Sequence, residues 1–131
     1  MREIVFATAA VIRSGKRYLV DLRSFDDAHG GLWEFPGGKL DWGEAPRDCL
    51  VRELSEELGI KASVGKLIDI ISHVYPNGRQ FIIAFYECET DDEPMPMECE
   101  RVEWMTLREI GELDLLDADR LILGTLAEAH R

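Results

Sequence analysis

The stretch that decides the fold is residues 38–60, which read GKLDWGEAPRDCLVRELSEELGI. Its second half predicts a helix over residues 46–58. Pro46 suits the first turn of a helix, where its missing N–H is not needed, and Gly59 suits the position just after the last turn. Ala45, which precedes the helix, is a poor N-cap because its side chain carries no acceptor.

The predicted helix separates acidic from apolar residues. At about 100° per residue, Glu53, Glu56 and Glu57 fall on one face within a single turn. The apolar stripe consists of Val51, Leu54 and Leu58. A solvated acidic face is the simplest interpretation. However, the three carboxylates repel one another and lie in the half of the helix where the macrodipole disfavours anions. A divalent cation such as Mg²⁺, which prefers oxygen ligands, would remove both costs.

The chain on both sides of this stretch predicts strands and a closing helix. Strands are expected at 4–12, 17–22, 32–35, 61–74, 79–87 and 102–105. Pro36, Gly37 and Gly38 are expected to break regular structure, and residues 75–78 (YPNG) to form a turn. Residues 107–110 predict a helical turn, and 118–129 a closing helix. This mixture favours a layered α/β sandwich over a doubly wound parallel sheet.

Composition limits the possible partners and location. The 131 residues fit one domain, 46% of them are apolar, and 26 acidic against 15 basic residues give a charge of −11. Such a surface argues against nucleic-acid polymers and anionic membranes as partners. There is no membrane-length apolar run or signal-peptide pattern, and the three cysteines lack C-x-x-C spacing. A reducing, cytoplasmic location is therefore expected.

The spacing of charged residues around the helix is specific. Gly38 is followed after five residues by Glu44, and after seven more by Arg52-Glu53-Leu54-Ser55-Glu56-Glu57-Leu58-Gly59-Ile60. This arrangement resembles the Nudix hydrolase family, whose signature G-x5-E-x7-R-E-U-x-E-E-x-G-U (U apolar) is matched at every position. Weaker similarity to the MutT-type nucleoside triphosphate pyrophosphohydrolases lies in residues 31–39 (GLWEFPGGK), 103–105 and 118–119.

The resemblance implies a fold and a chemistry. The fold is an α/β (α+β) class α/β/α sandwich with a mixed β-sheet, one central catalytic helix and a C-terminal helix, in a single domain over residues 1–131. The family cleaves a nucleoside diphosphate linked to another group, with water as nucleophile and Mg²⁺ or Mn²⁺ as cofactor.

Site residues follow from the same resemblance. The implied metal ligands are Glu53, Glu56, Glu57, the backbone carbonyl of Gly38, and Glu98, for which Glu100 is the rival. Glu53 is the first choice to orient or deprotonate the water, with Glu98 and Glu44 as alternatives. Arg52 and Glu44 are expected to form an ion pair that fixes the loop against the helix.

The substrate side of the site is implied by five further residues: Arg23, His29, Phe35, Lys39 and Asp119. Arg23 and Lys39 are expected at the phosphates or the base, and His29 in the pocket wall. Phe35, like Trp33, either stacks on the base or belongs to the core. Asp119 either accepts hydrogen bonds from the base or caps the closing helix.

The expected activity is hydrolysis of a small nucleoside triphosphate, such as 8-oxo-dGTP or CTP, to a monophosphate and pyrophosphate. One alternative is an ADP-ribose or nucleotide-sugar pyrophosphatase, to which Pro76, sixteen residues after Ile60, points. The proline also suits the expected turn. A second alternative is a non-catalytic nucleotide-binding sensor, a kind of protein that usually lacks one of the helix carboxylates; all of them are present here. The chain is expected to act as a monomer or homodimer.

Overall fold

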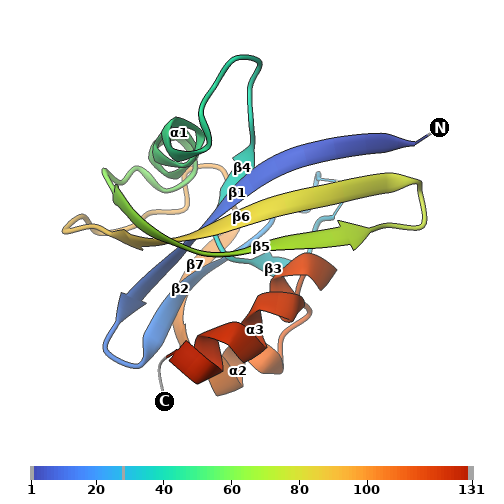
Figure 1. Cartoon of the computed structure of the whole chain (residues 1–131). Helices are drawn as coiled ribbons and strands as arrows, with labels where there is room; N and C mark the ends of the chain where they lie inside the picture. Colours follow the sequence, from blue (N-terminus) through green and yellow to red (C-terminus); the bar gives the residue numbers. More distant parts are fainter. Residues whose placement is uncertain (1, 28, 130–131) are drawn as a thin grey trace.

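The computed structural model describes residues 2–27 and 29–129, which form a sheet between helices (Figure 1). The strands are β1 (Glu3–Ser14), β2 (Arg17–Leu22), β3 (Trp33–Glu34), β4 (Gly37–Lys39), β5 (Ser63–Val74), β6 (Arg79–Glu89) and β7 (Arg101–Thr106). The helices are α1 (Pro46–Leu58), α2 (Leu107–Gly111) and α3 (Asp117–Ala129). No helix in the described ranges is long and apolar enough to cross a membrane.

β1 is the centre of a mixed sheet with the strand order β3-β2-β1-β6-β5. It runs parallel to β6 over most of its length, and its last residues, Arg13 and Ser14, pair antiparallel with β2. β4 adds to β1 and β7 adds to β2, both antiparallel. The predicted mixed sheet is confirmed.

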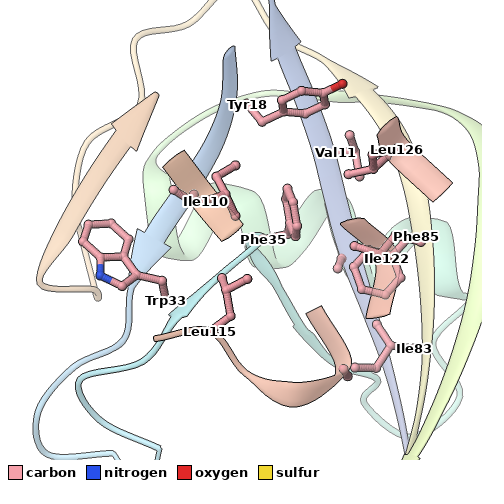
Figure 2. Packing of buried hydrophobic residues seen from close by; sticks show 13 residues of the cluster. Val11, Tyr18, Trp33, Phe35, Ile83, Phe85, Ile110, Leu115, Ile122 and Leu126 are labelled. Carbon is pink, nitrogen blue, oxygen red and sulfur yellow. The ribbon is translucent and has the colours of Figure 1, made fainter. Parts of the chain in front are cut away.

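Both faces of the sheet are buried, as the alternation along β1 shows. Ala9 and Val11 point toward the cluster under α2 and α3 (Figure 2), whereas Ala10 and Ile12 point toward the cluster under α1. Side chains alternate between faces in a strand, so an unbroken apolar run is what two helical layers require. The predicted α/β/α sandwich is therefore confirmed.

Helix α1 has the predicted bounds but not the predicted buried stripe. Its buried residues are Cys49, Leu50, Leu54 and Leu58, and Val51 is 41% exposed. Cys49 and Leu50 lie on either side of Glu53 and Glu57 around the helix. The inward face therefore includes these two glutamates, and the interpretation of a merely solvated acidic face does not hold for them. Gly59 ends the helix with φ 65°, as expected.

Residues 37–39 contradict the prediction that this segment breaks regular structure. They form β4, with Ala9 opposite Gly37 and Thr8 opposite Gly38. A Cβ on Gly37 would overlap the Thr8 carbonyl. The glycines thus permit a close strand approach rather than a turn. The 75–78 turn is confirmed, with Tyr75 N–H donating to the Arg79 carbonyl at 2.9 Å.

Candidate active site

Arg52 joins helix α1 to the loop before it. Its Nε and Nη2 donate to the two carboxylate oxygens of Glu44 at 2.8 and 2.9 Å, and Nη1 donates to Glu53 Oε1 at 2.8 Å. Nη2 also donates to the backbone carbonyl of Lys39 at 3.2 Å. The expected ion pair is confirmed, and it lowers the pKa of Glu44 to about 2.

Glu53 lies against the backbone of β4. A Cβ on Gly38 would overlap the Glu53 carboxylate, so only glycine allows this contact. The Glu53 side chain is 15% exposed, whereas that of Glu56 is 49% exposed and lies 3.2 Å from Arg52 Nη1. The structure thus brings the Gly38 backbone and Glu53 together and leaves Glu56 at the solvent edge of the same site.

Glu57 meets two carboxylates that sequence reasoning missed, Asp21 of β2 and Glu34 of β3. One oxygen atom from each of the three residues lies within 4.8 Å of the others. Burial and the charges of Glu34 and Glu53 raise the pKa of Glu57 to about 9. Burial and Glu34 raise the pKa of Asp21 well above its usual range. A carboxylate directly after the buried run of residues 18–20 was the sequence signal for Asp21.

A cleft of about 530 Å³ opens beside these carboxylates. It brings together eight of the predicted site residues: Arg23, His29, Phe35, Gly38, Lys39, Glu53, Glu57 and Asp119. Glu44, Arg52 and Glu56 are not in its lining. Glu98 lines a smaller neighbouring pocket that also contains Glu57. The alternative ligand Glu100 accepts a hydrogen bond from Phe25 N–H at 3.3 Å and so contacts the loop between β2 and β3.

Three cationic side chains line the cleft, and they differ in whether an ion pair already holds them. Arg23 is held by Glu34 at 2.7 Å and by Asp27. Arg79 pairs with Glu3 at 3.0 Å. Lys39 is exposed and has no ion pair within the part of the chain that the structure describes. A phosphate group would therefore bind Lys39 without having to displace a carboxylate.

Asp119 is inside helix α3, not at its N-cap, so the capping interpretation is wrong. It is 3% exposed, and its Oδ2 accepts from the backbone N–H of Phe35 at 2.7 Å. Burial and the charge of Glu34 raise the pKa of Asp119 well above its usual range. The Asp119 side chain thus ties helix α3 to the segment after β3 and holds one wall of the cleft in place.

The aromatic surface of the cleft differs from the expected one. Phe35 is 2% exposed and packs edge-on against Phe85 in the core (Figure 2), so its ring offers no face for stacking. The half-buried aromatics of the cleft are Tyr75 and Phe81, with ring centroids 5.3 Å apart. Both were missed. His29 lies in the cleft as expected, 5.7 Å from the Tyr75 ring.

The site is suited to a divalent cation. Every candidate ligand is an oxygen, and burial together with the neighbouring carboxylates Glu34 and Glu53 raises the pKa of Glu57, so added positive charge at this point would favour its ionised form. A hard cation such as Mg²⁺ binds carboxylate and carbonyl oxygens and would supply that charge. The chemistry of the donor set therefore fits a metal-dependent phosphate site.

Comparison with known proteins agrees with this geometry. The sequence pattern of the NUDIX domain matches residues 3–123. An 8-oxo-dGTP diphosphatase from Haemophilus influenzae is 34% identical over 133 residues, which cover 98% of this chain and 96% of the relative. A CTP pyrophosphohydrolase from Escherichia coli is 42% identical over 66 residues, 50% of this chain and 49% of the relative.

Comparison with solved structures agrees with the sequence comparison. The crystal structure of a MutT NUDIX hydrolase from Burkholderia pseudomallei superposes with a TM-score of 0.85 at 28% identity, covering 94% of this chain and 98% of that one. Family members generally use divalent metals and act on small nucleotides, which suits the carboxylates and the cleft. The chain belongs to the Nudix hydrolase family and is a pyrophosphohydrolase related to the MutT-type enzymes.

Proposed function

We propose that this chain hydrolyses a nucleoside triphosphate of the 8-oxo-dGTP or CTP kind to a nucleoside monophosphate and pyrophosphate, with Mg²⁺ as cofactor. The observation that carries the proposal is one cleft that joins α1 carboxylates, cationic side chains and an aromatic pair. Triphosphate, metal and base each find matching chemistry there. The proposal includes the cytoplasmic location expected from the sequence and a chain acting as a monomer or homodimer.

The phosphate end of the cleft is formed by β4 and α1. The residues that would hold Mg²⁺ are Glu53, Glu56, Glu57 and the carbonyl of Gly38, with Glu98 nearby. When bound, the cation neutralises phosphate charge and lowers the pKa of a coordinated water. Lys39, whose ammonium contacts the Phe81 ring but has no ion pair within the described residues, binds phosphate oxygens. Glu53, held by Arg52, orients the water and accepts its proton on a carboxylate oxygen.

The base end of the cleft is formed by Tyr75, Phe81 and Asp119. A nucleobase would stack on these two half-buried rings in competition with Lys39 and Arg79, which lie 6.0 and 5.4 Å from the Phe81 ring centroid. Asp119 stands in the wall, with one oxygen fixed by Phe35 N–H. An ionised Asp119 only accepts hydrogen bonds, whereas a protonated one also donates, so its protonation selects the base edge that it reads. The substrates named for both reported relatives are nucleoside triphosphates, in support of this class.

The two alternatives from the sequence have less support. Pro76, the pointer to ADP-ribose, is an exposed residue of the β5–β6 turn and is not in the cleft lining, so the turn accounts for it. A non-catalytic sensor does not require Glu53, Glu56 and Glu57 together; all three are present, Glu53 and Glu56 bonded to Arg52 and Glu57 lining the cleft.

A hydrolysis screen tests the proposal. The purified chain is incubated with millimolar Mg²⁺ and with 8-oxo-dGTP, dGTP, CTP, dCTP, ADP-ribose or a nucleotide sugar. Phosphate is measured with and without added inorganic pyrophosphatase for the triphosphates, and with and without alkaline phosphatase for ADP-ribose and the nucleotide sugar. We expect phosphate from one or a few triphosphates, and only when pyrophosphatase is added. Monophosphate formed from ADP-ribose alone would contradict the substrate class, and binding without turnover in Mg²⁺ or Mn²⁺ would contradict the enzyme.

A further inference from the structure

Behind the cleft, carboxylates from three elements converge. Asp21 comes from β2, Glu34 from β3 and Glu57 from α1. Asp21 and Glu34 are direct partners in the antiparallel β2–β3 register, so their side chains emerge side by side on the face toward α1. Asp21 is 1% and Glu34 7% exposed. Like charges placed opposite each other in a ladder repel, and burial strengthens the repulsion.

Several oxygens of this cluster lack an N–H donor. Within residues 2–27 and 29–129, no N–H group donates to Asp21 Oδ1, Asp21 Oδ2 or Glu57 Oε2, and all three atoms are buried; the Nε of Arg23 is likewise buried without an acceptor. Buried polar atoms almost always have a partner, and an orphaned carboxylate is among the most costly exceptions. Arg23 offsets only part of this charge, because its bonds go to Glu34 and Asp27.

We propose that Asp21, Glu34 and Glu57 form a second divalent-cation site, distinct from the one at Glu53, Glu56 and the Gly38 carbonyl. The three oxygens lie within 4.8 Å of one another, so a small approach of the side chains brings them into one Mg²⁺ shell, in which opposite oxygens are about 4.2 Å apart. Glu57 is shared, because it lines both the cleft and the smaller pocket. The inference goes beyond the proposed reaction and does not require any particular substrate.

A route for the ion exists. A pocket of about 120 Å³ reaches the cluster and is lined by Asp21, Glu34 and Glu57 together with Arg23, Ser24, Asp27, Glu98 and Cys99. Its five carboxyl groups outnumber the single guanidinium of Arg23, which favours a cation, and its size leaves room for the waters that Mg²⁺ and Mn²⁺ retain. The predominance of oxygen donors favours these ions over those that prefer thiolates. The ion would stabilise β2, β3 and α1 against one another.

Mn²⁺ binding to the nucleotide-free protein tests the site. The loss of the free Mn²⁺ signal in electron paramagnetic resonance gives the stoichiometry for the wild type and for Asp21→Asn, Glu34→Gln and Glu53→Gln. We expect two ions per chain in the wild type and one in each variant. Asp26→Asn, which removes an exposed charge from the nearby loop, is the matched control and should retain two. Glu34→Gln provides a second test if Asp21→Asn does not fold.

Anomalous diffraction from crystals grown with Mn²⁺ then locates the ions. A peak between Asp21, Glu34 and Glu57 supports the site, and it should vanish in Glu34→Gln. A single peak at Glu53 and Glu56, or unchanged stoichiometry in the folded Asp21 and Glu34 variants, overturns it. Two ions in a protein that hydrolyses no triphosphate would contradict the proposed function and leave this site standing.

Discussion

Glu53 and Glu57 come from adjacent turns of one helix, yet their surroundings differ. Glu53 is held by Arg52 at 2.8 Å and lies against the Gly38 backbone, whereas Glu57 faces Asp21 and Glu34. We expect Glu53→Gln to lower kcat by about 10²–10⁴-fold, because the amide keeps the volume but cannot accept a proton. Circular dichroism should be unchanged. Asp48→Asn, an exposed change on the same helix, is the control, and a near-normal kcat for Glu53→Gln would refute its role.

Asp119 allows stability and specificity to be separated. Its carboxylate satisfies the buried Phe35 N–H at 2.7 Å. Asp119→Ala orphans that donor and should lower the free energy of unfolding by about 1–3 kcal/mol. Asp119→Asn retains an acceptor for Phe35 but alters the donor pattern facing the base. We expect it to change the ratio of kcat/KM between 8-oxo-dGTP and CTP at least about tenfold with little loss of stability. An unchanged ratio would assign Asp119 to structure alone.

At single positions, the sequence predicted residues that are neighbours in the chain better than those that meet only in the fold. Glu53, Glu57 and Arg52 follow from the spacing on one helix. Asp21 and Glu34 meet through the β2–β3 register, and Tyr75 and Phe81 through the turn of another hairpin. Helical spacing carries no information about such pairings, which depend on the register between two strands.

Helix α1 is oriented by one arginine fork. Arg52 reaches Glu44 in the preceding loop, Glu53 on its own helix and the carbonyl of Lys39 in β4. We expect Arg52→Lys to lower kcat while leaving the helix content unchanged, since a lysine ammonium cannot form the two-pronged bond to Glu44. Arg47→Lys, an exposed arginine on the same helix, is the control. Equal kcat in both variants would show that the fork does not position the carboxylates.

Elements with strong local signals were predicted with accurate bounds. Pro46 and Gly59 mark the two ends of α1, and the turn at residues 75–78 follows from its own composition. Strand β4 was missed because two glycines read as a break, although here they allow the backbone to approach β1. Val51 was predicted to be buried because it lies on the same side of the helix as Leu54 and Leu58. A stripe of three residues does not fix the centre of the buried face, which depends on how the helix packs on the sheet.

Across the whole molecule, the sandwich concentrates acidic side chains where the layers meet. Asp21, Glu34 and Glu57 lie between the sheet and α1, where burial raises the pKa of each. The fold tolerates this arrangement because two apolar clusters, one on each face, hold the layers together. Stability and metal binding are therefore expected to depend on each other.

The pH dependence of stability measures this coupling. The pKa of Glu57 is raised from 4.5 to about 9, so between these values the folded chain holds a proton that the unfolded chain has released. Stability is then highest below about pH 4.5 for this group and falls as pH rises toward 9. The burial of Asp21, Glu34 and Asp119 acts in the same direction. Glu44, with its pKa lowered to about 2, contributes a constant amount across this window.

In chelator, we therefore expect Tm to fall as the pH is raised from about 5 to 9, and Glu57→Gln to flatten the slope because it has no proton to release. A divalent cation replaces that proton, so millimolar Mg²⁺ should raise Tm more at about pH 8 than at about pH 6. Differential scanning calorimetry with and without Mg²⁺ gives both quantities. Asp48→Asn should retain the wild-type slope. A Tm that does not change with pH in chelator, or a Mg²⁺ effect equal at both pH values, would show that Glu57 is ionised in the metal-free protein.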